Sequence, residues 1–391
     1  MTDFPVVLTT AVDNTTDALA KHLNNLEAKI GIDDSAVVAS LDYRSKILMP
    51  LDSMTRQAVM NGNFDIWQRG ITSATLTDIS TTFTADRFYD YVFDNEGTLP
   101  VLTRSRQSLT AGAINGAFYY SRLTTDGAGT SFGGGAKHNY QHKIKHGTRY
   151  LTDGKNVTVS FWAKSDIVDK KIGLYLIQSY GSGGSPTSDE DIVGINWTLT
   201  SSWVKYTHTF TTNTLTGKTF GTNVDDSLRI VLSYMWGTEE DDEVDASGAE
   251  DYVGAGDIDI AQVQLCAGSV ALPFQPKSFA QELADCQRYY EKSYNYTTFP
   301  GTASDDASFY LTASGINLRT FVPFKVTKMI IPTVTCYAVA TGTINKATNV
   351  DDSNADVTIT VAAEGHGGYQ AAISSTDEYR YRWHWTADAE L

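Results

Sequence analysis

The residues best suited to contact a ligand lie on a short alternating segment of the chain. Apolar and polar residues alternate over residues 157–163, which predicts a strand with one buried face. Trp162 falls on the polar side with Ser160 and Lys164, and Arg229 has the same position in a second alternating segment. A tryptophan ring can stack on a sugar ring while polar neighbours bind its hydroxyls. These four residues are candidate ligand-binding residues, although a subunit interface or a structural role for the tryptophan stays open.

A second cluster could bind a cation. Residues 237–259 contain ten carboxylates and no lysine or arginine. Their mutual repulsion favours an extended, solvated loop. A divalent cation such as calcium could relieve the repulsion, with Asp257 and Asp259 as the ligand candidates where the loop enters the next strand. The spacing of an EF-hand is absent, so no metal ligand is assigned and both interpretations stay open.

Three histidines, His138, His142 and His146, are spaced four residues apart. On a helix this spacing would stack the rings and invite a metal ion, but the glycines at 133–135 and the nearby lysines argue against both the helix and the cation. We expect an exposed basic strand or loop. The sequence also has no Gly-x-Ser-x-Gly elbow, so we predict no catalytic residue, no cofactor and no enzymatic activity.

The sequence predicts that most of the elements carrying the candidate residues above are strands. From residue 61 to 276, short threonine-rich and aromatic runs alternate with period two and are separated by Gly, Asn, Asp and Ser. The predicted fold class is mainly β, with a jelly-roll-type β-sandwich over 61–276. We place a helical connector at 277–295 and a small C-terminal β domain at 296–391, where Pro323 and Pro332 mark strand edges or turns.

The first sixty residues show a different periodicity. From Val12 onward, apolar residues spaced by seven, four, three and four predict a heptad seam, in which the oligomerisation residues are Leu19, Leu23, Leu26 and Ile30. Short helices are only marginally stable in isolation, so the segment 1–60 is expected either to pack on its own chain or to join copies of the chain.

Composition excludes several classes of protein. The formal net charge of -16 has the wrong sign for binding a phosphate backbone, so nucleic acid is not an expected partner. The three cysteines, Cys266, Cys286 and Cys336, are widely spaced and indicate neither a disulfide scaffold nor a zinc site. No apolar run suggests a signal peptide or membrane insertion, so we expect synthesis in the cytoplasm.

Several motifs, taken in order, resemble tail fibre and other tail-associated virion structural proteins of tailed bacteriophages. The motifs lie at residues 23–31, 40–43, 61–70, 85–88, 161–164, 260–265, 281–290 and 386–391. The resemblance implies a virion component of the phage tail, made in the host cytoplasm, that forms a homotrimer and assembles with other virion tail proteins. It also implies a β-sandwich similar to carbohydrate-binding modules, and it transfers no catalytic residue.

Three functions compete on this basis. The first is a receptor-binding fibre or spike protein that attaches the particle to a host surface polysaccharide. The second is a purely structural adaptor or decoration protein of tail or capsid. A glycan depolymerase is the least favoured, because the chain lacks the repeat of a long β-helix.

Overall fold

The computed structural model describes residues 54–390 apart from a few short gaps. The gaps are Ala74, Asn95, Val253, residues 313–317 and residues 375–378. The predicted seam residues Leu19, Leu23, Leu26 and Ile30 lie outside the described residues.

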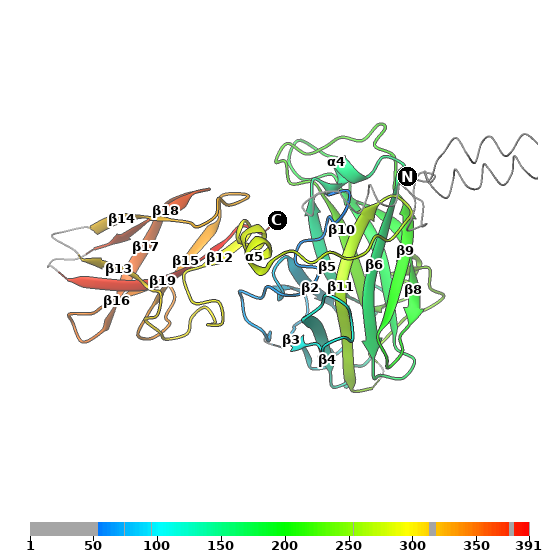
Figure 1. The fold of residues 1–391 in the computed structure, drawn as a ribbon, viewed down its shortest axis with the longest axis horizontal. Coiled ribbons are helices and arrows are strands. Elements are labelled where there is room, and N and C mark those ends of the chain that lie inside the picture. The colour runs from blue at the N-terminus through cyan, green and yellow to red at the C-terminus, as the bar shows by residue number, and fades with distance from the viewer. Residues whose placement is uncertain are drawn as a thin grey trace, which may run out of the picture.

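Two antiparallel sheets form a sandwich (Figure 1). The first sheet has six strands in the spatial order β1 (Ser80–Phe83), β2 (Phe88–Phe93), β5 (Lys137–Lys145), β10 (Ser227–Trp236), β7 (Lys171–Ser179) and β8 (Glu190–Thr198). The second has five strands in the order β3 (Leu102–Ser108), β4 (Tyr119–Thr125), β11 (Gly256–Ala267), β6 (Asn156–Ser165) and β9 (Val204–Thr211). A short helix, α4 (Gly147–Leu151), follows β5, and a 3-10 turn, η1 (Asp242–Val244), follows β10.

The sandwich core lies between these sheets, as period-two alternation predicts. On β6, Val157, Val159, Phe161 and Ala163 are all fully buried in one cluster. On β10, Leu228, Ile230, Leu232 and Tyr234 join the same cluster from the opposite sheet. Alternate residues of a strand face opposite sides, so the residues between these point outward. The mainly β, sandwich fold class is confirmed.

A third sheet follows the sandwich along the chain. It is reached through α5 (Phe279–Gln287), which Ser278 caps by accepting a hydrogen bond from the Gln281 N–H at 3.3 Å. The sheet has the order β12 (Tyr290–Lys292), β19 (Arg380–Asp388), β16 (Lys346–Asn349), β17 (Ala355–Gly365), β18 (Gly368–Ile373) and β14 (Leu318–Pro323). Two further strands, β13 (Phe309–Thr312) and β15 (Thr333–Ala338), also pair with β19.

The third sheet meets the sandwich beside α5 (Figure 1). Ion pairs and a cation–π contact join the two there. The Arg87 guanidinium forms an ion pair with Glu390 and lies 3.5 Å from the centre of the Tyr289 ring. Arg69 pairs with Asp388 at 3.0 Å. Because Arg87 and Glu390 are both buried, the chain end is held firmly against the sandwich.

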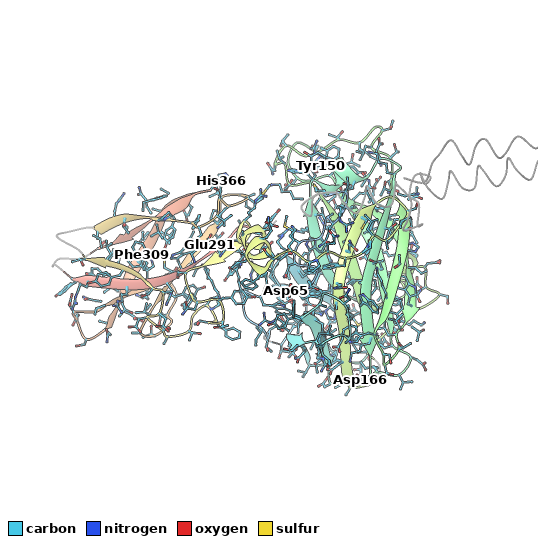
Figure 2. All side chains as sticks on the ribbon, viewed as in Figure 1. Asp65, Tyr150, Asp166, Glu291, Phe309 and His366 are labelled. Carbon is cyan, nitrogen blue, oxygen red and sulfur yellow. The ribbon has the colours of Figure 1, made fainter. Side chains whose placement is uncertain are left out.

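Hydrogen bonds from the segment after Met60 complete this junction. The Asn61 N–H donates to Glu282 Oε1 at 2.5 Å, and the Tyr296 hydroxyl donates to the Asp65 carbonyl at 2.8 Å. Figure 2 shows Asp65 on the sandwich side and Glu291 on the other side of the junction. At Gly62 any side chain would collide with the Val263 carbonyl, since a Cβ would lie 2.0 Å from that oxygen. The motifs at 61–70, 85–88, 281–290 and 386–390 thus meet at one place.

The expectation of an exposed basic segment at the histidines is wrong. His138 and His142 lie on β5 with their side chains 0% and 1% exposed, because residues four apart on a strand share its inward face. His138 Nε2 lies 2.8 Å from Asp90 Oδ1, and Asp90 accepts two hydrogen bonds from Arg104 at 2.6 and 2.7 Å. Burial opposes ionisation of Asp90, but Arg104 and His138 outweigh burial and lower the pKa of that carboxyl.

Helix α5 is shorter than the connector predicted at 277–295. Cys286 is buried in this helix, whereas Phe279 is half exposed and packs its edge on Tyr296. Tyr290, which lies inside the connector predicted at 277–295, begins β12 instead. Within the residues that are described, no helix has both the length and the apolar character needed to span a bilayer.

Candidate functional site: a groove on the six-stranded sheet

The outward face of the six-stranded sheet carries a groove of about 430 Å³. The register explains which residues reach it. Gln141 of β5 lies opposite Tyr89 of β2 and Val231 of β10, and Val231 lies opposite Tyr175 of β7. The groove is lined by Thr81, Tyr89, Tyr91, Lys137, Asn139, Gln141, Lys143, Tyr175, Ile177, Asp189, Asp191, Arg229 and Glu243.

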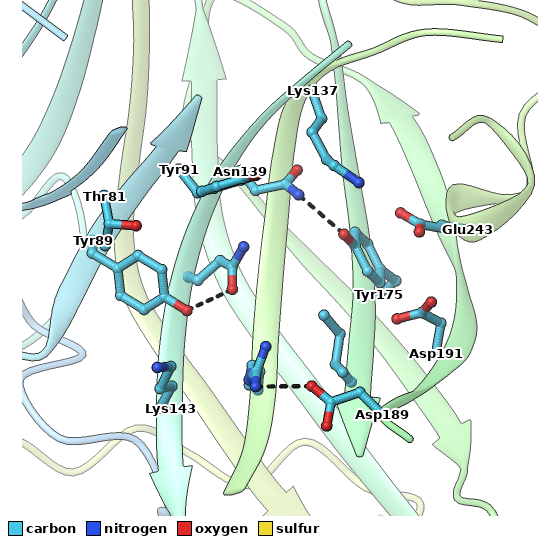
Figure 3. A pocket seen from close by; sticks show the side chains of 13 residues that line it. Thr81, Tyr89, Tyr91, Lys137, Asn139, Lys143, Tyr175, Asp189, Asp191 and Glu243 are labelled. Carbon is cyan, nitrogen blue, oxygen red and sulfur yellow. Dashed lines mark hydrogen bonds and ion pairs between the residues drawn. The ribbon is translucent and has the colours of Figure 1, made fainter. Parts of the chain in front are cut away.

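Tyrosine and amide side chains form the floor of this groove (Figure 3). The Tyr89 hydroxyl donates to Gln141 Oε1 at 2.7 Å, and Asn139 Nδ2 donates to the Tyr175 hydroxyl at 3.0 Å. Burial raises the pKa of Tyr89 to about 12, so its hydroxyl stays protonated and keeps its role as a donor. These bonds fix the orientation of the floor before any ligand binds.

Two polar atoms of the groove lack a hydrogen-bond partner among the described residues. They are Oδ1 of Asn139, whose side chain is only 2% exposed, and Nε of Arg229. A buried polar atom without a partner costs free energy, about 1–3 kcal/mol, which a suitable ligand group can recover. An acceptor at Asn139 and a donor at Arg229 are the complement of a hydroxyl-bearing ligand.

Charged side chains stand on both sides of the floor. Arg229 pairs with Asp189 at 2.9 Å, and Lys137 pairs with Glu240 at 2.7 Å. Burial, together with the negative charges of Glu240 and Asp191, raises the pKa of Glu243 to about 7. Carboxylates therefore gather on the side of β8 and η1.

The opposite side of the groove is positive. Burial, together with the charges of Arg229 and Arg87, lowers the pKa of Lys143 to about 8. Lys143 Nζ also lies 5.5 Å from the centre of the Tyr89 ring, a cation–π distance. The groove is thus polar, aromatic and asymmetric in charge.

The four residues predicted as ligand-binding do not lie in one groove. Arg229 lines the groove, whereas Trp162, Ser160 and Lys164 lie on β6 in the five-stranded sheet. Both sets face outward, but on opposite sides of the sandwich. Alternation along one strand predicts which side chains point away from the core, and it carries no information on which sheet the strand joins.

The surroundings of Trp162 differ from the groove. The tryptophan is half-buried, and Lys164 pairs with Asp259 at 3.2 Å while Ser160 is 2% exposed. Lys164 Nζ also lies 5.5 Å from the centre of the Trp203 ring, and Trp203 packs against Tyr120 at 5.3 Å between ring centres. These contacts hold the polar side of β6 in a network with its neighbours.

Sequence reasoning missed most of the groove. Tyr89, Asn139, Gln141 and Tyr175 were not singled out. A signal was present, because residues 137–145 alternate with period two around the two inward histidines. Reading those histidines as core residues of a strand would have placed Asn139 and Gln141 on the outward face.

The acidic segment is folded and not extended. Val244 of η1 is 1% exposed and packs with Tyr175, Val231 and Trp236, which holds the loop against β7 and β10. Burial of this apolar side chain overcomes the repulsion expected from the sequence. The loop supplies Glu243 to the rim of the groove.

Lysines and arginines from elsewhere in the chain neutralise several of these carboxylates. Glu250 pairs with Lys170 at 2.8 Å, and Arg122 pairs with Asp257 at 2.6 Å and with Asp259 at 2.7 Å. Over the described ranges, no group of three or more His, Cys, Asp or Glu side chains is arranged to hold a metal ion. The cation candidates Asp257 and Asp259 are engaged by arginine.

Comparisons with known proteins give low similarities. No family model and no curated protein matches the sequence. A CBM4 structure is 16% identical over 53% of this chain and 97% of its own, with a TM-score of 0.28. The family 11 carbohydrate-binding module from Clostridium thermocellum, solved with a mixed-linked tetrasaccharide, is 13% identical over 52% of this chain and 99% of its own, with a TM-score of 0.27. The tandem CBM22 domain from Paenibacillus barcinonensis is 9% identical over 82% and 93%, with a TM-score of 0.26.

Proposed function

We propose that this chain is a non-enzymatic glycan-binding protein that uses the groove on the six-stranded sheet. The observation that carries the proposal is that the buried Asn139 Oδ1 has no hydrogen-bond partner among the described residues. It belongs to a groove whose floor is fixed by the Tyr89–Gln141 and Asn139–Tyr175 hydrogen bonds. A sugar hydroxyl can donate to such an oxygen and accept from a neighbouring arginine. Because the side chains of the groove floor are held in place before a ligand binds, fewer of them have to be ordered on binding, which lowers its entropic cost.

We further propose that the protein is a tail fibre or spike protein of a bacteriophage and attaches the particle to a host surface polysaccharide. The support is the ordered resemblance of its motifs to tail-associated virion proteins and the heptad spacing of Leu19, Leu23, Leu26 and Ile30. In this proposal residues 1–60 join three copies of the chain and meet other tail proteins. The sandwich and the third sheet then project away from that assembly.

The glycan part is tested by binding of the full chain to a panel of bacterial surface polysaccharides. We expect Arg229→Ala to weaken binding at least tenfold, because the guanidinium lines the groove and anchors Asp189. Trp162→Ala, on the opposite outer face, is the matched comparison and should leave binding within twofold. Equal binding by wild type and Arg229→Ala would reject the groove.

The oligomer is tested separately. The mass in solution of the full chain at micromolar concentration should be that of three chains, and Leu23→Asp with Leu26→Asp should reduce it to one. A monomeric wild-type protein would reject the homotrimer and leave the glycan proposal untouched.

A second candidate is a purely structural adaptor or decoration protein. The observation that favours it is the outward face of the five-stranded sheet, where Trp162, Trp203 and Arg122 supply the aromatic residues and arginine that are enriched at subunit interfaces. Antibody labelling of intact particles separates the two. A position on the capsid shell, away from the tail tip, would favour the structural role.

A further inference from the structure

The distribution of charge in the groove narrows the class of glycan it can take. Three carboxylates, Asp189, Asp191 and Glu243, line one side of the groove, and Glu240 lies close enough to act on the latter two; these four are here called the acidic wall. Two of them already have cations, since Asp189 pairs with Arg229 and Glu240 pairs with Lys137. No lysine, arginine or histidine of the described residues forms an ion pair with Asp191 or Glu243.

The two unpaired carboxylates are neighbours in the fold. Asp191 of β8 lies opposite Ile177 of β7 in the strand register. Glu243 approaches Tyr175, two residues earlier on the same face of β7, and the two side chains interact. Figure 3 shows both carboxylates on the same side of the groove, directed toward the space above Tyr175.

Their surroundings disfavour two negative charges. Burial raises the pKa of Asp191. The positive charge of Lys137 lowers it, and the negative charges of Glu240 and Asp189 raise it further. A cation placed between Asp191 and Glu243 would offset this repulsion and form charge-assisted hydrogen bonds. An anionic sugar would add to the repulsion instead, so the wall also selects against uronic and sialic acids.

A second observation points to a ligand at this wall. Asn139 Oδ1, buried and without a partner among the described residues, belongs to the side chain that donates to the Tyr175 hydroxyl. A sugar seated over Tyr175 can therefore donate a hydroxyl to Asn139 while one of its substituents meets the wall. The acidic residues alone would not define a site, whereas the acidic wall and this buried acceptor border the same space.

We propose that the groove binds a glycan with a free amino group, and that its ammonium lies between Asp191 and Glu243. This inference rests on the proposed glycan-binding function and names the class of sugar for the same site. The amino sugar supplies the cation with which Asp191 and Glu243 form no ion pair among the described residues, and an N-acetylated sugar of the same length supplies none.

The test compares three hexasaccharides by isothermal titration calorimetry with the full chain, at a pH that keeps the amine protonated. The probes are the glucosamine hexamer, the N-acetylglucosamine hexamer and the galacturonic acid hexamer. We expect the first to bind at least tenfold more tightly than the second, and the third to bind most weakly. Asp191→Asn and Glu243→Gln should each weaken binding of the glucosamine hexamer about tenfold and change binding of the N-acetylated hexamer less than twofold.

The control addresses the net charge of -16, which attracts any polycation without a specific site. Asp352→Asn removes an exposed carboxylate from the third sheet and should leave the preference unchanged. A preference that survives both wall substitutions, or that Asp352→Asn removes equally, would overturn the proposal. So would the absence of any preference for the amine in the wild-type protein.

The two proposals fail in distinguishable ways. Arg229-dependent binding of another glycan, with no binding of either glucosamine-based hexamer, overturns the amino-sugar assignment and leaves the proposed function standing. Calcium ions offer a further discriminating probe. A rise in melting temperature with calcium that Asp191→Asn abolishes would assign the wall to a metal and reject the ammonium.

Discussion

The two outward faces of the sandwich are built from the same alternating pattern and differ in what surrounds it. On the five-stranded face, Arg122 and Lys164 both pair with Asp259, so charges of opposite sign meet directly. On the six-stranded face, the loop with η1 stands along one side and leaves Asp191 and Glu243 without ion pairs among the described residues. The difference explains why the six-stranded face is the one proposed to bind a ligand: a neighbouring loop borders its polar strands and leaves polar groups without partners among the described residues.

The largest effect is expected from the contact that supports both faces. Arg104 and Asp90 form an ion pair between the sheets with both side chains 0% exposed. Arg104→Met should lower the free energy of unfolding by about 3–5 kcal/mol, because it leaves a buried carboxylate without its main partner. Urea denaturation measures the loss. A change below 1 kcal/mol would show that the pair does not hold the sheets together.

A smaller effect is expected from a substitution confined to the six-stranded face. Tyr175→Phe removes the hydroxyl that Asn139 donates to and that interacts with Glu243. We expect glycan affinity to fall about tenfold, or about 1.4 kcal/mol, because the floor loses its fixed orientation. Titration calorimetry measures it, with Trp162→Ala from the other face as the control. Unchanged affinity in Tyr175→Phe would place the ligand elsewhere.

The pH dependence of stability sharpens the comparison further. With a folded-state pKa of about 7 against an ordinary value of 4.5, Glu243 binds more protons in the folded than in the unfolded chain between those values. The free energy of unfolding therefore falls as pH rises through this window. Glu243→Gln should gain about 1 kcal/mol at pH 8 relative to pH 4.5, after allowance for solvent screening. Melting temperatures at the two pH values check this, and an equal shift at both would contradict it.

The smallest effect is expected on the five-stranded face. Lys164→Met removes an ion pair whose carboxylate, Asp259, keeps its bonds to Arg122. Such partly exposed pairs contribute about 0–1 kcal/mol, so stability should change by less than that. Denaturation in urea measures it beside the Arg104 variant. A loss above 2 kcal/mol would make this network a structural element equal to the buried pair.

Local pattern predicted the strands well. The alternation at 157–163 placed Val157, Val159, Phe161 and Ala163 inside correctly, because a strand exposes alternate residues to opposite sides. In the C-terminal region, the strand-like runs at 307–311, 315–324, 333–340, 357–361 and 379–386 match β13, β14, β15, β17 and β19, whereas β12, β16 and β18 were missed. The domain limits at 60, 276 and 295 stay predictions, as does the role of the N-terminal seam.

The site was much less predictable. Arg229 was identified from its outward position, but its groove neighbours come from β1, β2, β5, β7, β8 and η1, which are far apart in the sequence. Trp162 also points away from the core, but it lies on the five-stranded sheet and therefore faces the opposite side of the sandwich. The motifs at 85–88 and 386–391 gave a resemblance, yet their physical role as a junction became visible only when Arg87 and Glu390 were placed together.

By itself, the sequence determined which residues avoid water, because period-two spacing of apolar side chains is a local property of each strand. It also determined the excess of negative charge. The tertiary structure alone decided which strands became neighbours, and therefore which polar side chains share a groove and which carboxylates form no ion pair within the described part of the chain. Pairing between distant strands is set by the packing of the whole core, and no short stretch of sequence contains that information.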